Sequence, residues 1–202
     1  MFTSAVAHRR ALHRIPELDH DLPETLAYVT SVLKPLNGTV SFPTAESVCA
    51  FFDAGKPETV AFRADMDALP VTEENGAPYA SLCPGKMHAC GHDAHAAALV
   101  GAARILHANR DKFAGKILFS WQPGEEIGYG ARLIIDEGNI DGAGRSFGLH
   151  LASNVPVGSV VLMPGPNNAS VDWFRIRVHG LGAHVSTPEL GVDAAYIASQ
   201  IV

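Results

Sequence analysis

Apolar residues recur with helical spacing in the first part of the chain. Residues 4–14 and 22–34 both carry apolar side chains three or four positions apart, which is typical of a helix with one buried face. Pro16 lies between the two segments and Pro23 lies at the start of the second, where proline is tolerated because the first turn needs no backbone donor. The sequence therefore predicts two helices at its beginning.

Short runs rich in β-branched and aromatic residues follow, and they predict strands at 48–52, 59–64, 116–121, 146–149 and 158–163. Between them, residues 94–109 and 130–137 have helical patterns, the first preceded by Asp93 as a plausible N-cap. Strands that alternate with helices indicate an α/β fold built around a sheet.

A cluster of turn-forming residues at 163–170 indicates a domain boundary. We therefore assign residues 1–168 to a first domain and residues 169–202 to the beginning of a second. In the second part, residues 173–179 alternate like a strand, residues 180–184 form a glycine-rich loop, and a helix starts at 192 and runs to the chain end without a cap. The second domain looks unfinished.

Composition excludes several classes of protein. With 47% hydrophobic and 18% charged residues the chain is typical of a soluble globular protein. Its net charge of −6 and the lack of a Lys/Arg run argue against a nucleic-acid partner. No apolar run reaches the roughly 20 residues of a membrane span, so we expect a cytoplasmic protein. Cys49, Cys83 and Cys90 are too few for a disulfide scaffold, and each is a free thiol or a ligand.

The stretch HACGHDAH at residues 88–95 places three histidines and a cysteine, all able to bind metal, next to a predicted helix start. Cys90 and His92 stand two positions apart and can both reach one ion, and the helix N-terminus is expected to help keep Cys90 ionised. His88 and His95 are expected beside the site or on the helix face and not as ligands. The alternative interpretation is a capping loop whose histidines are solvated.

Acids and imidazoles also follow three predicted strands. Glu125 and Glu126 come after the strand at 116–121, Asp65 and Asp67 after 59–64, and His150 after 146–149. A lone Glu-Glu pair is usually solvated surface, and single acids and histidines often belong to turns or cores. Because α/β sheets build their sites where strands end, we expect these side chains to share one edge with Cys90 and His92. One glutamate would then bind metal while its neighbour acts as a base.

Five stretches, at 62–70, 88–93, 122–126, 148–150 and 180–184, resemble, in order, the motifs of the metallopeptidase family that includes aminoacylase and carboxypeptidase G. The Cys-Gly-His-Asp version is similar to the branch of hippurate hydrolase, N-acyl-amino-acid amidohydrolases and hydrolases of indole-acetyl amino acids. The resemblance implies an α/β catalytic domain of zinc-peptidase type, a mixed sheet flanked by helices, interrupted by an α+β lid that dimerises. It covers the N-terminal half of such an enzyme.

Carried over to this sequence, the resemblance implies that Cys90 bridges two divalent ions. His92 and His150 would complete one metal site and Glu126 would serve the other. Glu125 would be the general base. Zinc suits a thiolate ligand best, although manganese, cobalt or nickel can occupy such a site.

Further implied roles are less direct. Asp67 matches the acid that orients a metal-binding imidazole, and Asp65 stands where other branches place that imidazole. His184 matches the lid histidine that steadies the substrate carbonyl across a homodimer. The family usually has histidine after the proline of the lid motif, whereas Glu189 follows Pro188 here, which puts the contacts to a substrate carboxylate in question.

The implied activity is hydrolysis of the amide bond of small N-acyl amino acids or peptides. A water held between two divalent ions about 3.5 to 4 Å apart would become the attacking hydroxide when Glu125 takes its proton. A dipeptidase or a deacetylase of amino-acid precursors is a rival within enzymes. The family's last ligand, a later histidine, has no counterpart before Val202. The other class of function is therefore a truncated, non-catalytic fragment that binds metal or a partner, although Glu125 beside Glu126 favours an enzyme parentage.

Overall fold

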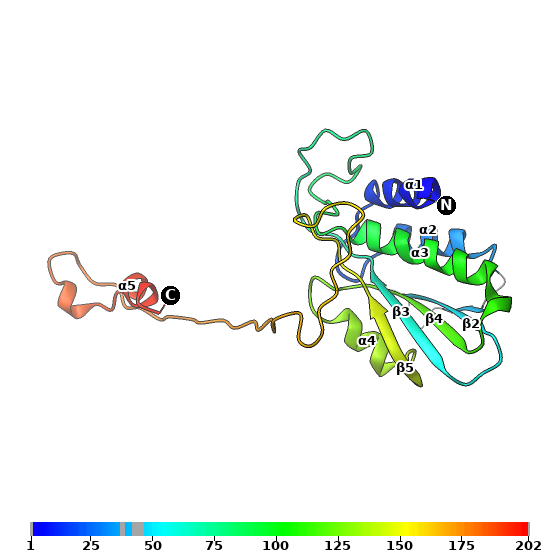
Figure 1. Ribbon diagram of the computed structural model, residues 1–202. Helices are drawn as coiled ribbons and strands as arrows, with labels where there is room; N and C mark the ends of the chain where they lie inside the picture. Colours follow the sequence, from blue (N-terminus) through cyan, green and yellow to red (C-terminus); the bar gives the residue numbers. More distant parts are fainter. Residues whose placement is uncertain (1, 37–38, 42–46, 202) are drawn as a thin grey trace. The chain divides into compact units, whose positions relative to one another are not determined.

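A computed structural model describes residues 2–36, 39–41 and 47–201 (Figure 1). The chain divides into two compact units, Met1–Asn154 and Val155–Val202, and each is described by itself. The domain boundary that the sequence predicts after residue 168 lies within the second unit and stays a prediction. No helix of the described residues is long and apolar enough to cross a membrane.

The first unit contains a mixed sheet of five strands in the order β1-β2-β4-β3-β5. The strands are β1 (Thr39–Ser41), β2 (Val48–Asp53), β3 (Thr59–Asp65), β4 (Lys116–Gln122) and β5 (Ala143–Gly148). β1 and β2, and β2 and β4, are antiparallel, whereas β3 runs parallel to both β4 and β5. The C-terminal ends of β3, β4 and β5 consequently meet at one edge of the sheet.

Helices cover both faces of this sheet. Figure 1 shows α1 (Phe2–His13), α2 (Pro23–Leu33) and α3 (His92–Ala108) on one face and α4 (Gly130–Asp136) on the other. The main core lies between the sheet and the first three helices, and its largest buried side chains include Trp121, Phe119, Met66 and Leu33. The predicted fold class is confirmed: an α/β fold with a mixed sheet and flanking helices.

The predicted helices and strands of residues 1–154 are found, with ends that differ by a few residues. The three-residue strand β1 was not predicted. The prediction of Asp93 as N-cap is wrong, because α3 begins at His92 after Gly91, which has the left-handed φ of 102°. Asp93 is instead buried in the first turn, where its carboxylate pairs with side chains of α1.

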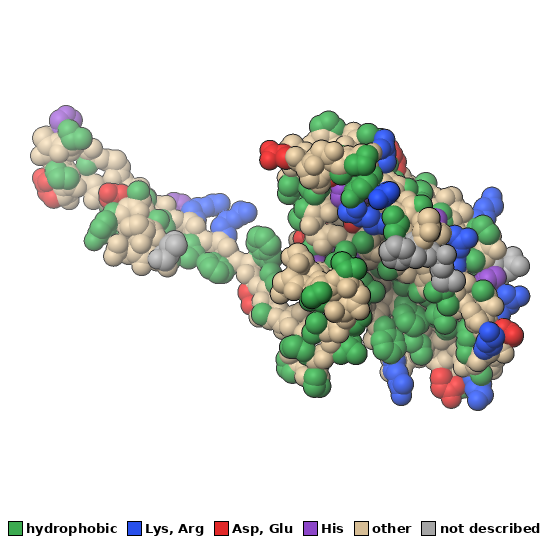
Figure 2. Space-filling model, turned by 45° about the horizontal axis from the view of Figure 1, so that its top comes forward, with side chains coloured by type: hydrophobic (Ala, Val, Ile, Leu, Met, Phe, Trp, Pro, Cys, Tyr) green, Lys and Arg blue, Asp and Glu red, His purple; other side chains and the backbone are tan. Residues whose placement is uncertain are grey.

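The second unit contains α5 (Ala194–Ser199) and a short 3₁₀ turn, Pro188–Leu190. The predicted strands at 158–163 and 173–179 are wrong, because these residues pair with no neighbouring strand and a strand needs a partner for its backbone groups. The helix predicted from 192 to the chain end is wrong in its bounds, because α5 begins after Asp193, which accepts the backbone N–H of Tyr196, and ends at Ser199. Trp173 is exposed. Figure 2 shows hydrophobic side chains on the surface of this unit.

Candidate metal centre

Five predicted site residues meet where β3, β4 and β5 end and α3 begins. The ligand atoms of Cys90, His92 and His150 lie within 4.8 Å of one another, and so do those of His92, Glu125 and Glu126. His92 belongs to both groups: its Nε2 is 3.8 Å from a carboxylate oxygen of each glutamate. The Cys90 thiol approaches the Nε2 atom of His150 at 3.4 Å. The shared edge that the sequence predicts is therefore present in the structure.

The turn into α3 sets the positions of Cys90 and His92. Gly91 between them has φ of 102°, and a Cβ at this position would lie 3.3 Å from the Leu151 side chain. A glycine satisfies both constraints because it lacks the Cβ that makes positive φ costly. The sharp turn lets the thiol before the helix and the imidazole of its first residue face the same space.

Asp67 connects the loop after β4 to the first residue of α3 by hydrogen bonds. Its two carboxylate oxygens accept the backbone N–H groups of Glu125 and Glu126, each at 3.0 Å. Its backbone carbonyl accepts Nδ1–H of His92 at 2.8 Å. Burial alone would raise the pKa of Asp67, but the hydrogen bonds from His92, Glu126 and Glu125 outweigh it and lower the pKa. Asp67 is therefore a carboxylate that orients one imidazole and two glutamates.

Two polar atoms at the centre are buried without a hydrogen-bond partner: Nε2 of His92 and Oε1 of Glu126. Such orphaned atoms are rare unless a water, an ion or a ligand satisfies them. Because Nδ1–H of His92 donates to Asp67, Nε2 is the nitrogen that carries the lone pair in the neutral ring, and it faces two carboxylates. Sulfur, imidazole and carboxylate donors around one point fit a divalent cation such as zinc.

The pKa of the Cys90 thiol depends on whether a cation is present at the centre. Burial, followed by the charges of Glu126, Glu125 and Asp65, raises the pKa of Cys90 to about 12. Without a cation, burial and the nearby carboxylates oppose a thiolate, so the helix N-terminus does not by itself keep Cys90 ionised. A cation among these residues would reverse the balance, since opposite charge favours the ionised thiol.

Asp65, His92 and His95 form a third, fully buried group of possible donors. The Oδ1 atom of Asp65 is 2.6 Å from Nδ1 of His95, and its Oδ2 atom pairs with Arg63 at 3.0 Å. Burial acts to raise the pKa of Asp65, but the hydrogen bond from His95 and the charges of His92, Arg63 and His95 lower it to about 2. His95 is thus buried beside the site, as the sequence indicates.

His88 lies on the other side of Cys90 in the sequence and is 4% exposed. Neither of its ring nitrogens has a hydrogen-bond partner. Burial lowers its pKa to about 4. The ring is therefore a neutral, buried histidine, and it belongs to none of the groups of possible metal donors found among the described residues.

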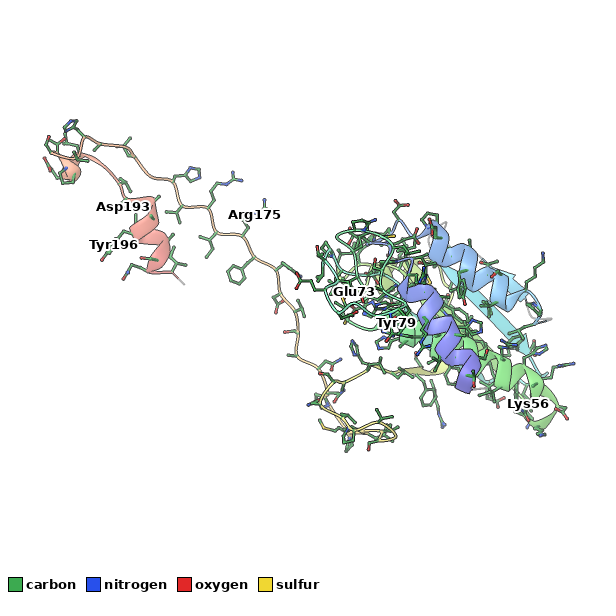
Figure 3. All side chains as sticks on the ribbon, turned by 90° about the horizontal axis from the view of Figure 1, so that it is seen from above. Lys56, Glu73, Tyr79, Arg175, Asp193 and Tyr196 are labelled. Carbon is green, nitrogen blue, oxygen red and sulfur yellow. The ribbon has the colours of Figure 1, made fainter. Side chains whose placement is uncertain are left out.

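A buried polar network that sequence reasoning missed lies next to the centre. His13 at the end of α1 stands between two carboxylates, with Nδ1 2.7 Å from Asp93 and Nε2 3.0 Å from Glu73. Arg9 also pairs with Asp93 at 2.8 Å and stacks over Tyr79. Figure 3 shows Glu73 and Tyr79 on the loop beside α1. No local pattern signals the network, because its members are far apart in the sequence.

His184 belongs to the second unit and is described only there. Its Nδ1 accepts the backbone N–H of Ser186 at 3.2 Å and lies 2.8 Å from the hydroxyl of the same residue. The proton of the neutral ring therefore resides on Nε2, which is left as a donor. The structure thus brings Asp67, Cys90, His92, Glu125, Glu126 and His150 together within the first unit.

The sequence of the chain is similar to known peptidases and amidohydrolases. Residues 61–201 match the model of peptidase family M20/M25/M40. The chain is 46% identical over 197 residues to N-acetyl-L-cysteine deacetylase of Bacillus subtilis. This alignment covers 96% of the chain and 47% of that protein. It is 41% identical to N-acyl-L-amino acid amidohydrolase of Geobacillus stearothermophilus, over 99% of the chain and 55% of that protein. The chain spans about half the length of these relatives.

The fold of the chain is similar to that of a solved structure from the same family. The YXEP protein of Bacillus subtilis, described as a dinuclear metal binding peptidase from the M20 family, superimposes with a TM-score of 0.77 at 36% identity. The match covers 81% of this chain and 47% of that one.

Proposed function

The chain belongs to peptidase family M20/M25/M40, and on that premise we propose that it carries the metal-binding residues of an amidohydrolase acting on N-acyl amino acids or small peptides. One observation supports this most directly. Cys90, Glu126 and the unpaired Nε2 of His92 gather at the sheet edge, with Glu125 immediately beside them. A purely structural cluster has no need for Glu125, whereas a hydrolytic site does.

The proposed ligands are Cys90, His92, His150 and Glu126, which would hold two divalent ions with Cys90 shared between them. Zinc or manganese are the ions proposed, with cobalt or nickel as substitutes. When bound, such ions supply a Lewis acid for the amide carbonyl and lower the pKa of water toward about 7.

Glu125 is proposed as the general base. Its side chain is 39% exposed compared with 22% for Glu126, so Glu125 is the carboxylate that water and substrate can reach. The Asp67 carboxylate fixes the Glu125 backbone. Glu125 would take a proton from the attacking water and return it to the leaving amine nitrogen, which is general acid–base catalysis by one group in two steps.

His184 is proposed to stabilise the oxyanion of the tetrahedral intermediate through Nε2–H, the donor that its contacts with Ser186 leave available. We assign residues 169–202 to a lid and dimerisation domain, and we propose a cytoplasmic homodimer. Among substrates, N-acetyl amino acids are the first to test, because one relative is named as an N-acetyl-L-cysteine deacetylase.

The test uses the full-length protein that contains this chain, with hippurate and N-acetyl amino acids as substrates. We expect Glu125→Gln to lower kcat by about 100-fold to 10,000-fold while bound metal, measured by elemental analysis, stays unchanged. Glu126→Gln is the matched control, and it should lose metal as well as turnover because a ligand is removed. Turnover of Glu125→Gln close to that of the wild type would rule out the assigned base. Metal binding without any turnover in the wild type would favour the non-catalytic alternative.

A further inference from the structure

The two ring nitrogens of His95 both have partners, and the partners define its protonation. Nε2 accepts the backbone N–H of Leu151 at 2.9 Å, while Nδ1 is 2.6 Å from the Asp65 carboxylate. A backbone amide can only donate, so Nε2 carries no proton and Nδ1–H donates to Asp65. His95 is 1% exposed. It is therefore a neutral imidazole with no lone pair left for a metal ion, although it lies one helical turn from His92.

Leu151 is the residue that follows the proposed ligand His150, and it is held at both of its backbone polar groups. Its N–H donates to His95, and its carbonyl accepts Nδ1–H of His150 at 2.7 Å. The second bond leaves Nε2 of His150 unprotonated and directed at Cys90, 3.4 Å away. The position and tautomer of His150 thus both depend on where the Leu151 backbone lies.

The segment around His150 has few other restraints. His150 and Leu151 are both exposed, and they follow β5, the edge strand of the sheet. The His95 ring also packs edge-on against the His150 ring, with 4.6 Å between centroids. The hydrogen bond from Leu151 N–H to His95 connects this exposed segment to a buried side chain of α3.

Asp65 in turn fixes His95. It ends β3, and both of its oxygens are engaged, one by His95 and the other by Arg63. A carboxylate behind an imidazole fixes the ring orientation and makes the far nitrogen a better acceptor. The contacts form one continuous path from β3 through α3 to the segment after β5.

We infer that Asp65 and His95 are positioning residues that hold the Leu151 amide and thereby place His150 for metal binding. This inference rests on the proposed metal centre. In the sequence motif, Asp65 stands where other branches of the family place a metal-binding histidine. The inference gives Asp65 a different role, which is to orient His95. Partners of this kind typically change metal affinity by about 10-fold to 100-fold when removed.

Two substitutions of similar polarity separate the two bonds of His95. In His95→Gln the side-chain oxygen can stand where Nε2 lies and accept the Leu151 N–H. In His95→Asn the shorter amide can still donate to Asp65 but cannot reach Leu151. We expect Co²⁺ titration of the full-length protein that contains this chain, monitored through the thiolate-to-cobalt absorption of Cys90, to show about 10-fold to 100-fold weaker binding for His95→Asn. His95→Gln should bind nearly as tightly as the wild type.

A second pair of variants tests whether the effect passes through His150. His150→Ala should weaken Co²⁺ binding, and adding His95→Asn to it should cost nothing more, because residues acting through one contact are not additive. Equal Co²⁺ affinity of His95→Asn and wild type, or a full additional loss in the His150→Ala background, would overturn the inference. A wild-type full-length protein that binds no Co²⁺, or binds it without the thiolate band, would instead overturn the proposed metal centre and the inference with it.

The unsubstituted chain provides a measurement that does not depend on variants folding. Nitrogen-15 NMR of the histidine rings should show His95 neutral, with its proton on Nδ1. A proton on Nε2, or a doubly protonated ring, is incompatible with acceptance of the Leu151 N–H and would overturn the inference.

Discussion

The carboxylate of Asp67 accepts the backbone N–H of Glu126 at 3.0 Å, although the two residues follow different strands of the sheet. Its other oxygen accepts the N–H of Glu125, and its backbone carbonyl accepts His92. A single buried acid therefore fixes the loop with both glutamates against the helix that carries a proposed ligand.

Asp67→Asn should disturb this arrangement while keeping the size of the side chain. An amide has one acceptor oxygen, so one of the two backbone N–H groups faces an NH₂ group and loses its partner. We expect the free energy of unfolding to fall by about 1–3 kcal/mol and Co²⁺ affinity to fall by about 10-fold or more. Urea denaturation and Co²⁺ titration measure the two effects. Asp136→Asn, at an exposed ion pair with Arg132, is the control and should change both very little; equal losses in the two variants would contradict the role of Asp67.

Alkylation of Cys90 should depend on pH in an unusual way. Its pKa is raised from 9.0 to about 12, first by burial and then by the charges of Glu126, Glu125 and Asp65. The thiolate is the reactive form, and its fraction rises about tenfold per pH unit below the pKa. With divalent ions chelated, labelling of Cys90 by iodoacetamide, followed by mass spectrometry, should keep accelerating above pH 9. Glu126→Gln should speed the reaction by lowering the pKa, whereas a rate that levels off near pH 9 would refute the electrostatic account.

Cys90→Ser should lose bound metal. A neutral hydroxyl is a weaker ligand than a thiolate for zinc or cobalt. We expect dialysed protein to retain much less metal by elemental analysis, and the thiolate-to-cobalt absorption to disappear. Cys83→Ser is the matched control, because Cys83 belongs to none of the groups of possible metal donors among the residues that the structure describes. Unchanged metal content in Cys90→Ser would show that Cys90 is only a partly buried thiol.

His13→Ala should destabilise the first unit without touching the proposed ligands. The change removes the ring between the carboxylates of Asp93 and Glu73, whose side chains are 0% and 4% exposed. Each carboxylate would lose a hydrogen-bond partner at a buried position, although Arg9 still pairs with Asp93, and we expect a loss of about 1–3 kcal/mol in urea denaturation. His179→Ala, in the exposed part of the second unit, serves as the comparison and should stay within about 0.5 kcal/mol. A loss for His13→Ala no larger than this would mean that the network contributes little.

Sequence reasoning located the candidate centre because strand ends are local features. An apolar run that ends in Trp121 before Glu125 and Glu126 predicts both a buried strand and polar groups at its end. The parallel direction of β3, β4 and β5 then brings the residues after them to a common edge. The periodicity of the chain was sufficient for that inference.

Contacts between distant elements could not be predicted in this way. The pairing of His13 with Asp93 joins α1 to α3, and a histidine at the end of an amphipathic helix looks like a surface residue. The contact between His95 and Leu151 involves a backbone N–H, which has no signature in the sequence. Asp93 resembled an N-cap because caps and buried acids use the same residue type. The prediction of strands in the second unit was wrong because alternating apolar and polar residues do not by themselves provide a neighbouring strand to pair with.

The order of the sheet has a consequence for how the chain folds during its synthesis. β4 lies between β2 and β3, yet both of its neighbours are made before it. β2 and β3 therefore cannot complete their ladders until β4 inserts between them, and such non-local pairing is slow because the intervening segment must first be closed into a loop. Glu125 and Glu126 follow β4 directly, so they reach Cys90 and His92 only after this insertion. The centre is therefore complete only when β4 has paired with both of its neighbours, and a cation bound there would stabilise the sheet with β4 in place.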